Sequence, residues 1–130
     1  MAAKTESQYL GDFLKYEAEA LYCREAVTVL AGSGVDRVLT TGMMLGRITA
    51  SGKVKQIDFS AADGSENAYG VLCFDVTAPV GADAKGTAIV RGPSVVARNG
   101  LVWPAGATEV QKNAAIAQLE AAGILAREGA

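Results

Sequence analysis

The chain has 130 residues, a formal net charge of −2 and an isoelectric point near 5.1. This length suits one domain with one core, and the acidic balance argues against a nucleic-acid-binding protein. No apolar run is long enough to span a membrane, and the first residues lack a signal-peptide core, so we expect a protein made in a reducing cytoplasm with two free cysteines.

The chain contains no histidine. This excludes the Ser-His-Asp and Cys-His catalytic arrangements and the usual zinc sites. We therefore expect no enzymatic activity, no metal and no cofactor.

Residues 1–24 differ in composition from the rest of the chain, because aromatic and aliphatic residues alternate irregularly with acids in "ESQYLGDFLKYEAEALY". Two interpretations stay open. The first is a loosely packed terminus or a short helix over residues 12–20, and the second is an arm that becomes ordered on a partner.

Residues 25–130 are predicted to form a β-rich body. Short strands are expected in "REAVTVLAGSG", "DRVLTTGMMLGRITASG", "KVKQIDF" (through Phe59), "AYGVLCFDV" and "GTAIVRGPSVVARNG", the last broken at Gly92-Pro93. The 15 glycines mark turns about every ten residues. The fold class is therefore α+β and mainly β, a small sandwich or barrel with an extended N-terminal arm and one C-terminal helix.

The C-terminal helix is predicted over residues 108–122. Thr108 is its N-cap, and Gln111 completes a capping box. Gly123 stands where a left-handed residue ends a helix, and Ile124 can then fold back onto Leu119.

One face of this helix carries only small or branched aliphatic residues: Val110, Ala114, Ala117 and Ala121. Alanine is the best helix former, which explains the pattern without any contact. The alternative is that this alanine stripe meets another subunit.

Both cysteines are expected to be unreactive. Cys73 lies in an apolar strand without any histidine to activate it, so it should pack as a small hydrophobe. Cys23 has Arg24 beside it but no second catalytic partner, and we expect it at the surface or an interface.

Four acids, Asp58, Asp63, Glu66 and Asp75, could be drawn as a calcium site or as a catalytic carboxylate pair. Their spacing does not match an EF-hand. Asp63-Gly64 is typical of a tight turn, so turn chemistry is the preferred interpretation.

Three further side chains could contact partners. Arg91 and Arg98 could form ion pairs within the chain or bind an acidic partner. Trp103, fixed by Pro104, anchors either a corner of the core or an interface.

Five motifs follow one another along the chain: "TTGMMLGRI", "DGSENAYGVL", "AIVRGPSVV", "LVWPAGAT" and an alanine-rich helix ending "AAGIL". Their order resembles that of the lambda-type bacteriophage head decoration proteins, also called capsid stabilisation or cement proteins. The resemblance covers residues 42–125.

The resemblance implies a non-enzymatic virion protein, made in the bacterial host cytoplasm, that binds the outside of an expanded capsid as a homotrimer. It would bind the major capsid protein and hold the shell against the pressure of the DNA, without nucleic-acid or membrane contacts. The implied capsid-binding arm is Ser7, Gln8, Tyr9, Leu10, Gly11, Asp12, Phe13 and Leu14. Possible subunit contacts are Arg91, Trp103, Ala114, Ala117 and Ala121.

Two other functions stay open. One is a phage tail or baseplate β-module or another non-enzymatic binding domain, such as a carbohydrate-binding one, although only 6% of residues are aromatic. The other is a small carboxylate hydrolase, which would require Asp63 or Glu66 to titrate abnormally.

Overall fold

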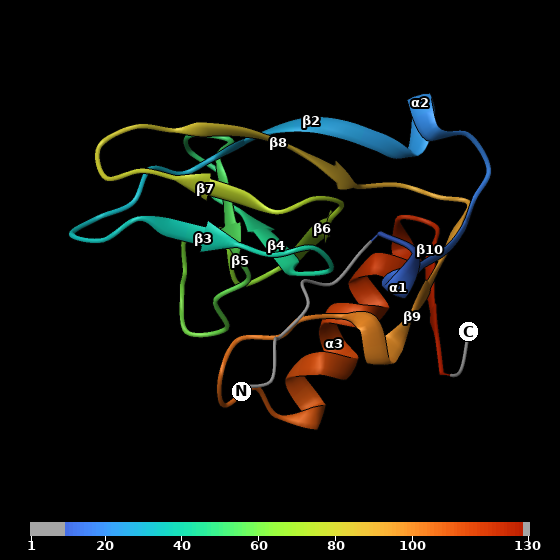
Figure 1. Cartoon of the computed structure of the whole chain (residues 1–130). Helices are drawn as coiled ribbons and strands as arrows, with labels where there is room; N and C mark the ends of the chain where they lie inside the picture. The colour runs from blue at the N-terminus through green and yellow to red at the C-terminus, as the bar shows by residue number, and fades with distance from the viewer. Residues whose placement is uncertain (1–9, 129–130) are drawn as a thin grey trace, which may run out of the picture.

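A closed five-stranded barrel forms the centre of the molecule in the computed structural model, which describes residues 10–128 (Figure 1). Its strands follow one another around the wall in the order β2-β5-β4-β6-β8. Their bounds are β2 Arg24–Val29, β4 Met44–Arg47, β5 Val54–Gln56, β6 Ala68–Leu72 and β8 Ala84–Ile89. Neighbouring strands are antiparallel except β2 and β5, whose parallel pairing at Val29 and Val54 closes the barrel.

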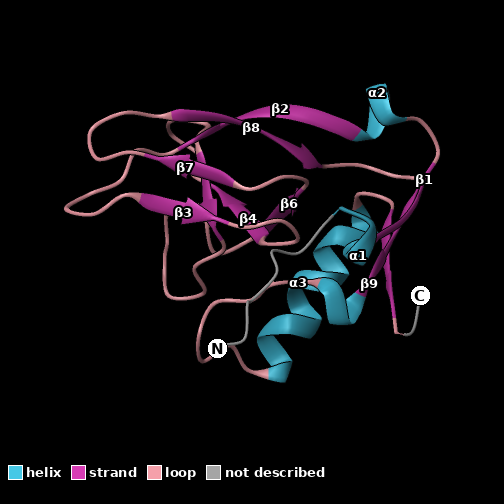
Figure 2. Ribbon diagram, viewed as in Figure 1, coloured by secondary structure: helices cyan, strands magenta, loops and turns pink. Residues whose placement is uncertain are grey.

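Two smaller sheets adjoin the barrel (Figure 2). One has the order β1-β9-β10 and combines the two ends of the chain; its strands are β1 Leu14–Glu17, β9 Ser94–Ala97 and β10 Ile124–Arg127. The other pairs β3, Arg37–Leu39, with β7, Val76–Ala78. The mainly β body predicted from the sequence is confirmed.

The helical elements are α1 Leu10–Phe13, α2 Ala20–Cys23, the 3-10 turn η1 Arg98–Gly100 and α3 Glu109–Ala121. The predicted limits of α3 are confirmed. Thr108 Oγ1 accepts the Gln111 amide at 3.2 Å, and Gln111 Oε1 accepts the Thr108 amide at 3.0 Å. Gly123 has a φ of +89°, and Leu119 and Ile124 lie in the same core cluster.

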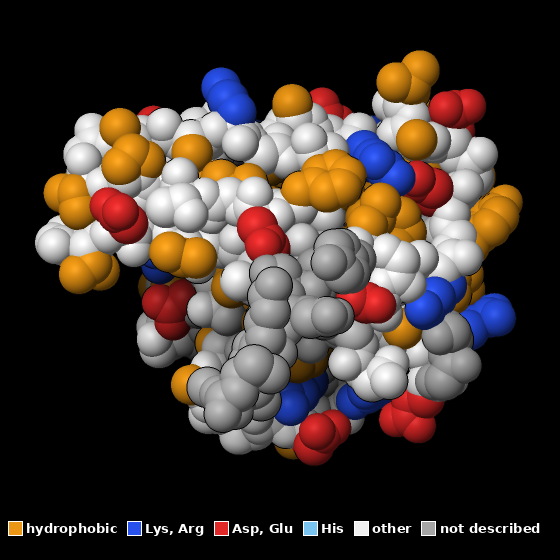
Figure 3. All heavy atoms as spheres, viewed as in Figure 1, with side chains coloured by type: hydrophobic (Ala, Val, Ile, Leu, Met, Phe, Trp, Pro, Cys, Tyr) orange, Lys and Arg blue, Asp and Glu red, His pale blue; other side chains and the backbone are white. Residues whose placement is uncertain are grey.

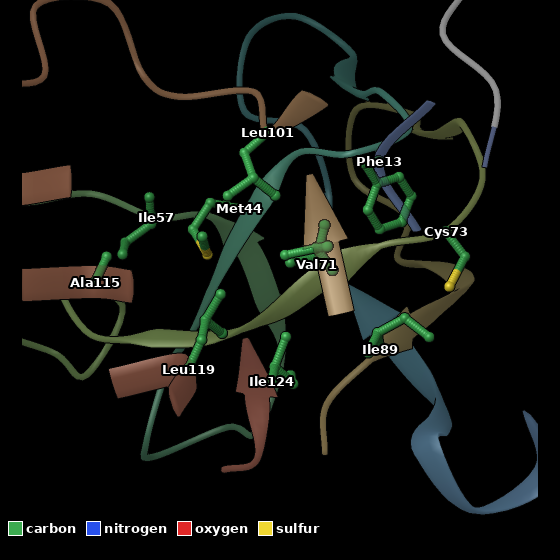
Figure 4. Packing of buried hydrophobic residues seen from close by; sticks show 11 residues of the cluster. Phe13, Met44, Ile57, Val71, Cys73, Ile89, Leu101, Ala115, Leu119 and Ile124 are labelled. Atoms are coloured by element: carbon green, nitrogen blue, oxygen red, sulfur yellow. The ribbon is translucent and has the colours of Figure 1, made fainter. Parts of the chain in front are cut away.

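The core has two parts because strand side chains alternate between two directions. Leu45, Leu72 and Ala88 belong to a cluster shared by barrel strands and the β3-β7 sheet. Their neighbours Met44, Val71 and Ile89 belong to a second cluster, which joins the barrel to α3 and the β1-β9-β10 sheet (Figure 4). The second cluster also contains Phe13, Cys73, Val96, Leu101, Leu119 and Ile124.

Gly70 lies in β6, where the barrel wall brings it close to β8. A Cβ at this position would lie 2.4 Å from the carbonyl oxygen of Ile89 on β8. Only glycine allows the two strands to approach this closely, so Gly70 serves the barrel wall.

Two sequence expectations need correction. The helix predicted over residues 12–20 is wrong, because this stretch contains the end of α1, the strand β1 and the start of α2. The strand expected through Phe59 ends at Gln56, where β5 stops. Pairing with a distant strand decides the first case, since Leu14 and Tyr16 lie opposite Val96 and Val95 of β9. In the second case, the pairing of β5 with β4 reaches only as far as Gln56, opposite Leu45.

Candidate functional site

Part of the predicted capsid-binding arm packs into the core of the body. Of the eight residues predicted to bind the capsid, Ser7, Gln8 and Tyr9 lie outside the described residues. Phe13 is fully buried in the core, and Leu10 and Leu14 pack against the same cluster. Gly11 and Asp12 are exposed.

Three large apolar side chains of the same segment face solvent instead. Tyr16 is 55% exposed, Leu21 92% and Tyr22 59%; we call these three residues the N-terminal apolar surface. Figure 3 shows hydrophobic side chains protruding at the upper right, where α2 lies in Figure 1. The sequence could have indicated this exposure, because apolar residues that fit neither a helical nor a strand period have no obvious place in a core.

Arg91 fastens this surface to the barrel. Its guanidinium donates to the carbonyl oxygen of Tyr22, pairs with Glu25 at 2.6 Å and lies 5.2 Å from the centre of the Tyr22 ring. The hydrogen bond to Glu25 is the main cause of a raised pKa for Arg91. Arg91 therefore has an acidic partner within its own chain, and it links Tyr22 of the predicted arm to Glu25 of β2.

Cys23 is a correction to the sequence analysis, which expected it at the surface or an interface. The residue is fully buried, and its Sγ lies 3.8 Å from the carbonyl oxygen of Pro93. Its own carbonyl accepts the amide of Val90 at 3.0 Å. This backbone bond ties the end of α2 to the end of β8 and turns the thiol inward.

Cys73 is fully buried, as expected. Burial raises the pKa of its thiol to about 11. The thiol therefore stays protonated at neutral pH, whereas the thiolate is the nucleophilic form.

Two of the four acids of the sequence analysis, Asp63 and Glu66, lie in one loop. Asp63 Oδ1 accepts the amide and the hydroxyl of Ser65 at 3.0 and 2.5 Å, and these bonds lower the pKa of Asp63. Glu66 accepts the Gly64 amide at 2.7 Å, and Gly64 has a φ of +105°. The turn interpretation of this loop is confirmed.

The other two acids differ from each other, because Asp58 bonds within its own loop whereas Asp75 bonds to a residue 34 positions earlier in the chain. Asp58 accepts from the amide and hydroxyl of Ser60, and Asp75 from those of Thr41. Within residues 10–128, no group of three metal-ligating side chains is close enough to hold a metal ion.

Trp103 is half-buried at the edge of the core. It packs against the cluster that contains Phe13, and its ring stacks on Phe59 with 6.5 Å between centroids. It also lines a surface pocket of about 510 Å³ together with Arg98, Lys112 and Glu128. Trp103 therefore anchors a core corner and still reaches the surface.

The alanine stripe of α3 faces away from the core. Ala114, Ala117 and Ala121 are exposed, and Val110 is 79% exposed. The helix packs through Ala115, Ile116 and Leu119. The stripe is thus available for contact with another molecule.

The longest helix in the described part of the chain is α3, with 13 residues, and no helix there can cross a membrane. A comparison with curated proteins found no match to this chain. The family model described as bacteriophage lambda head decoration protein D matches residues 3–124, nearly the whole chain. The chain therefore belongs to the bacteriophage lambda head decoration protein D family, which makes it a structural protein of a phage capsid.

Proposed function

We propose that this capsid protein binds the outer surface of an expanded phage head as a homotrimer and stabilises the shell against the pressure of packaged DNA. The observation that carries the proposal is the family match over residues 3–124. The docking partner is the major capsid protein, and the docking segment lies within residues 1–24. The body, residues 25–130, holds that segment in place.

The N-terminal apolar surface supports docking through this part of the chain. Leu21 is almost fully exposed on a four-residue helix, next to Tyr22. Neighbouring exposed apolar side chains are a common feature of protein–protein interfaces, and aromatic residues often dominate their binding energy. We therefore extend the proposed contact beyond Ser7–Leu14 to Tyr16, Leu21 and Tyr22.

The exposed stripe of α3 supports contact between subunits. Ala114, Ala117 and Ala121 have small side chains, so another surface can approach the helix backbone closely. Three-fold closure would also make the three arms bind together, and avidity of this kind can exceed single-site affinity by about 10² to 10⁴. Arg91 and Trp103 stay proposed subunit contacts.

The chemistry of the described side chains supports a purely structural role. Cys73 is protonated and buried. Asp63 has a lowered pKa and is bonded to Ser65, whereas a catalytic acid needs a raised pKa. The carboxylate hydrolase considered from the sequence gains no support.

Co-sedimentation with expanded and unexpanded capsids of the parent phage tests the proposal. We expect the full chain to sediment with expanded shells only. Removal of residues 1–9 retains Phe13 and β1, so this variant separates docking from stability of the body. A chain that starts at Cys23 is unsuitable, because it lacks Phe13.

A second comparison tests the N-terminal apolar surface. Leu21→Ser combined with Tyr22→Ser should weaken binding, whereas Val35→Ser, which changes another apolar residue that is 73% exposed, should not. Absence of binding by the full chain to either shell would overturn the proposal for that capsid. Equal binding by all variants would leave capsid binding intact but move the contact to the body.

A further inference from the structure

The outer strand of the β1-β9-β10 sheet has an open edge. β10 pairs with β9 in parallel over four residues, Ile124–Arg127. Among residues 10–128, no second strand pairs with β10. One side of this strand therefore presents main-chain groups that a further strand can pair with.

The hydrogen-bond pattern identifies the amides on that open side. The Ser94 amide donates to the Gly123 carbonyl at 3.2 Å. Successive residues of a strand direct their main-chain groups alternately toward one neighbouring strand and away from it. The amides of Leu125 and Arg127 therefore point toward β9. The amides of Ala126 and Glu128 point away from it.

The opposite edge of the same sheet is protected. The pairing of β1 with β9 shifts register between Leu14 and Tyr16, which marks a bulge or similar irregularity. β1 also carries Lys15 and Glu17, and Glu17 pairs with Arg24. Charges and bulges are the usual means by which edge strands avoid pairing, whereas the register of β10 with β9 is unbroken.

The side chains of β10 indicate what kind of strand fits. Leu125 is 40% exposed, and Arg127 is exposed without an ion pair to any described acid. The pocket that Trp103 lines also includes Glu128, directly after β10. An added strand can therefore place an apolar side chain beside Leu125 and a carboxylate near Arg127.

We propose that the open edge of β10 accepts an extended segment of a capsid subunit as an additional strand. The segment carries an apolar residue and an acid, complementary to Leu125 and Arg127. Strand addition of this type gains main-chain hydrogen bonds for affinity and side-chain contacts for specificity. This inference rests on the proposed function, because it assigns a second capsid contact to the same protein.

Substitution of Ala126 tests the inference in the full chain. Ala126→Pro removes an amide from the open edge but none from the ladder with β9, and we expect roughly tenfold weaker co-sedimentation with expanded capsids. Ala126→Gly keeps the amide and serves as the matched control, with binding close to that of the unmodified chain. Arg127→Glu should also weaken binding, more strongly at low salt than at high salt.

Hydrogen exchange gives a result even where Ala126→Pro fails to fold. In the unmodified protein, the C-terminal peptide that contains Ala126 and Glu128 should exchange more slowly after capsid binding. If the protein binds capsids but the exchange rate of this C-terminal peptide does not change, the inference is overturned and the proposed function stays intact. Slow exchange that depends only on the concentration of free protein would assign the edge to a second copy and overturn the capsid assignment.

Discussion

The segment before the barrel and the helix after it pack against the same core cluster, but different forces determine their structures. α3 begins at a capping box and ends at Gly123, so its limits follow from residues within the helix itself. The segment over residues 10–23 contains two four-residue helices and a four-residue strand. Its structure depends on distant contacts: Phe13 in the core, β1 against β9, and Arg91 bonded to Tyr22.

The N-terminal segment therefore has two roles. Its buried residues hold it to the body, and its exposed residues are available to a partner. Variants in this segment should therefore separate into those that destabilise the fold and those that weaken capsid binding alone. Loss of a buried side chain in this segment should cost more than loss of the local cap of α3.

Phe13→Ala should give the largest loss of stability. The side chain is fully buried, and truncation of a buried phenylalanine costs about 3–5 kcal/mol. Chemical denaturation of the two proteins measures this difference in the free energy of unfolding. Tyr16→Ala, in the same segment but 55% exposed, should cost less than about 1 kcal/mol; equal effects would show that residues 10–17 are not docked as described.

Gly100→Ala should have the next largest effect. A Cβ here would lie 2.6 Å from the Asp12 carbonyl oxygen and 2.9 Å from Phe13 Cα, so α1 must move away from η1. Overpacking of this kind costs about 1–3 kcal/mol. Gly11→Ala is the matched control, because a Cβ there meets nothing within 4 Å; thermal unfolding should show a loss for Gly100→Ala alone.

Thr108→Ala should destabilise the protein by about 1 kcal/mol through loss of the N-cap. The Gln111 amide then loses its side-chain acceptor. Thr108→Ser retains the hydroxyl and should restore most of the stability in the same unfolding measurement. A cost above that of Gly100→Ala would contradict the view that tertiary contacts at residues 10–13 outweigh this local cap.

The same contrast explains how much the sequence could predict. Thr108, Gln111 and Gly123 are local signals, and the helix they delimit is present. The side-chain hydrogen bonds of the turn at Asp63-Gly64 are local too, because they stay within residues 63–66. The order of motifs over residues 42–125 indicated the family, and recognising that order requires no knowledge of which strands pair.

Features that depend on distant partners could not be predicted in this way. The barrel closes through β2 and β5, which are joined by a parallel pairing that no turn signal specifies. Cys23 is buried because Val90 and Pro93, about 70 positions later, lie against it. The open edge of β10 follows from the position of β9, so it too was invisible in the sequence.

Glu17→Gln should give the smallest effect of the series. Glu17 receives two bonds from Arg24, at 3.1 and 2.5 Å, and this pairing is the main cause of the raised pKa of Arg24. Because both side chains are partly exposed to solvent and glutamine retains one acceptor, we expect a loss of about 0.5 kcal/mol. Arg24→Lys keeps the charge but cannot form the two-pronged bond, so a similar loss is expected. If high salt removes the difference in unfolding free energy for Glu17→Gln, charge attraction between Glu17 and Arg24 holds β1 to β2. If the difference persists at high salt, the two hydrogen bonds between these side chains hold the strands together.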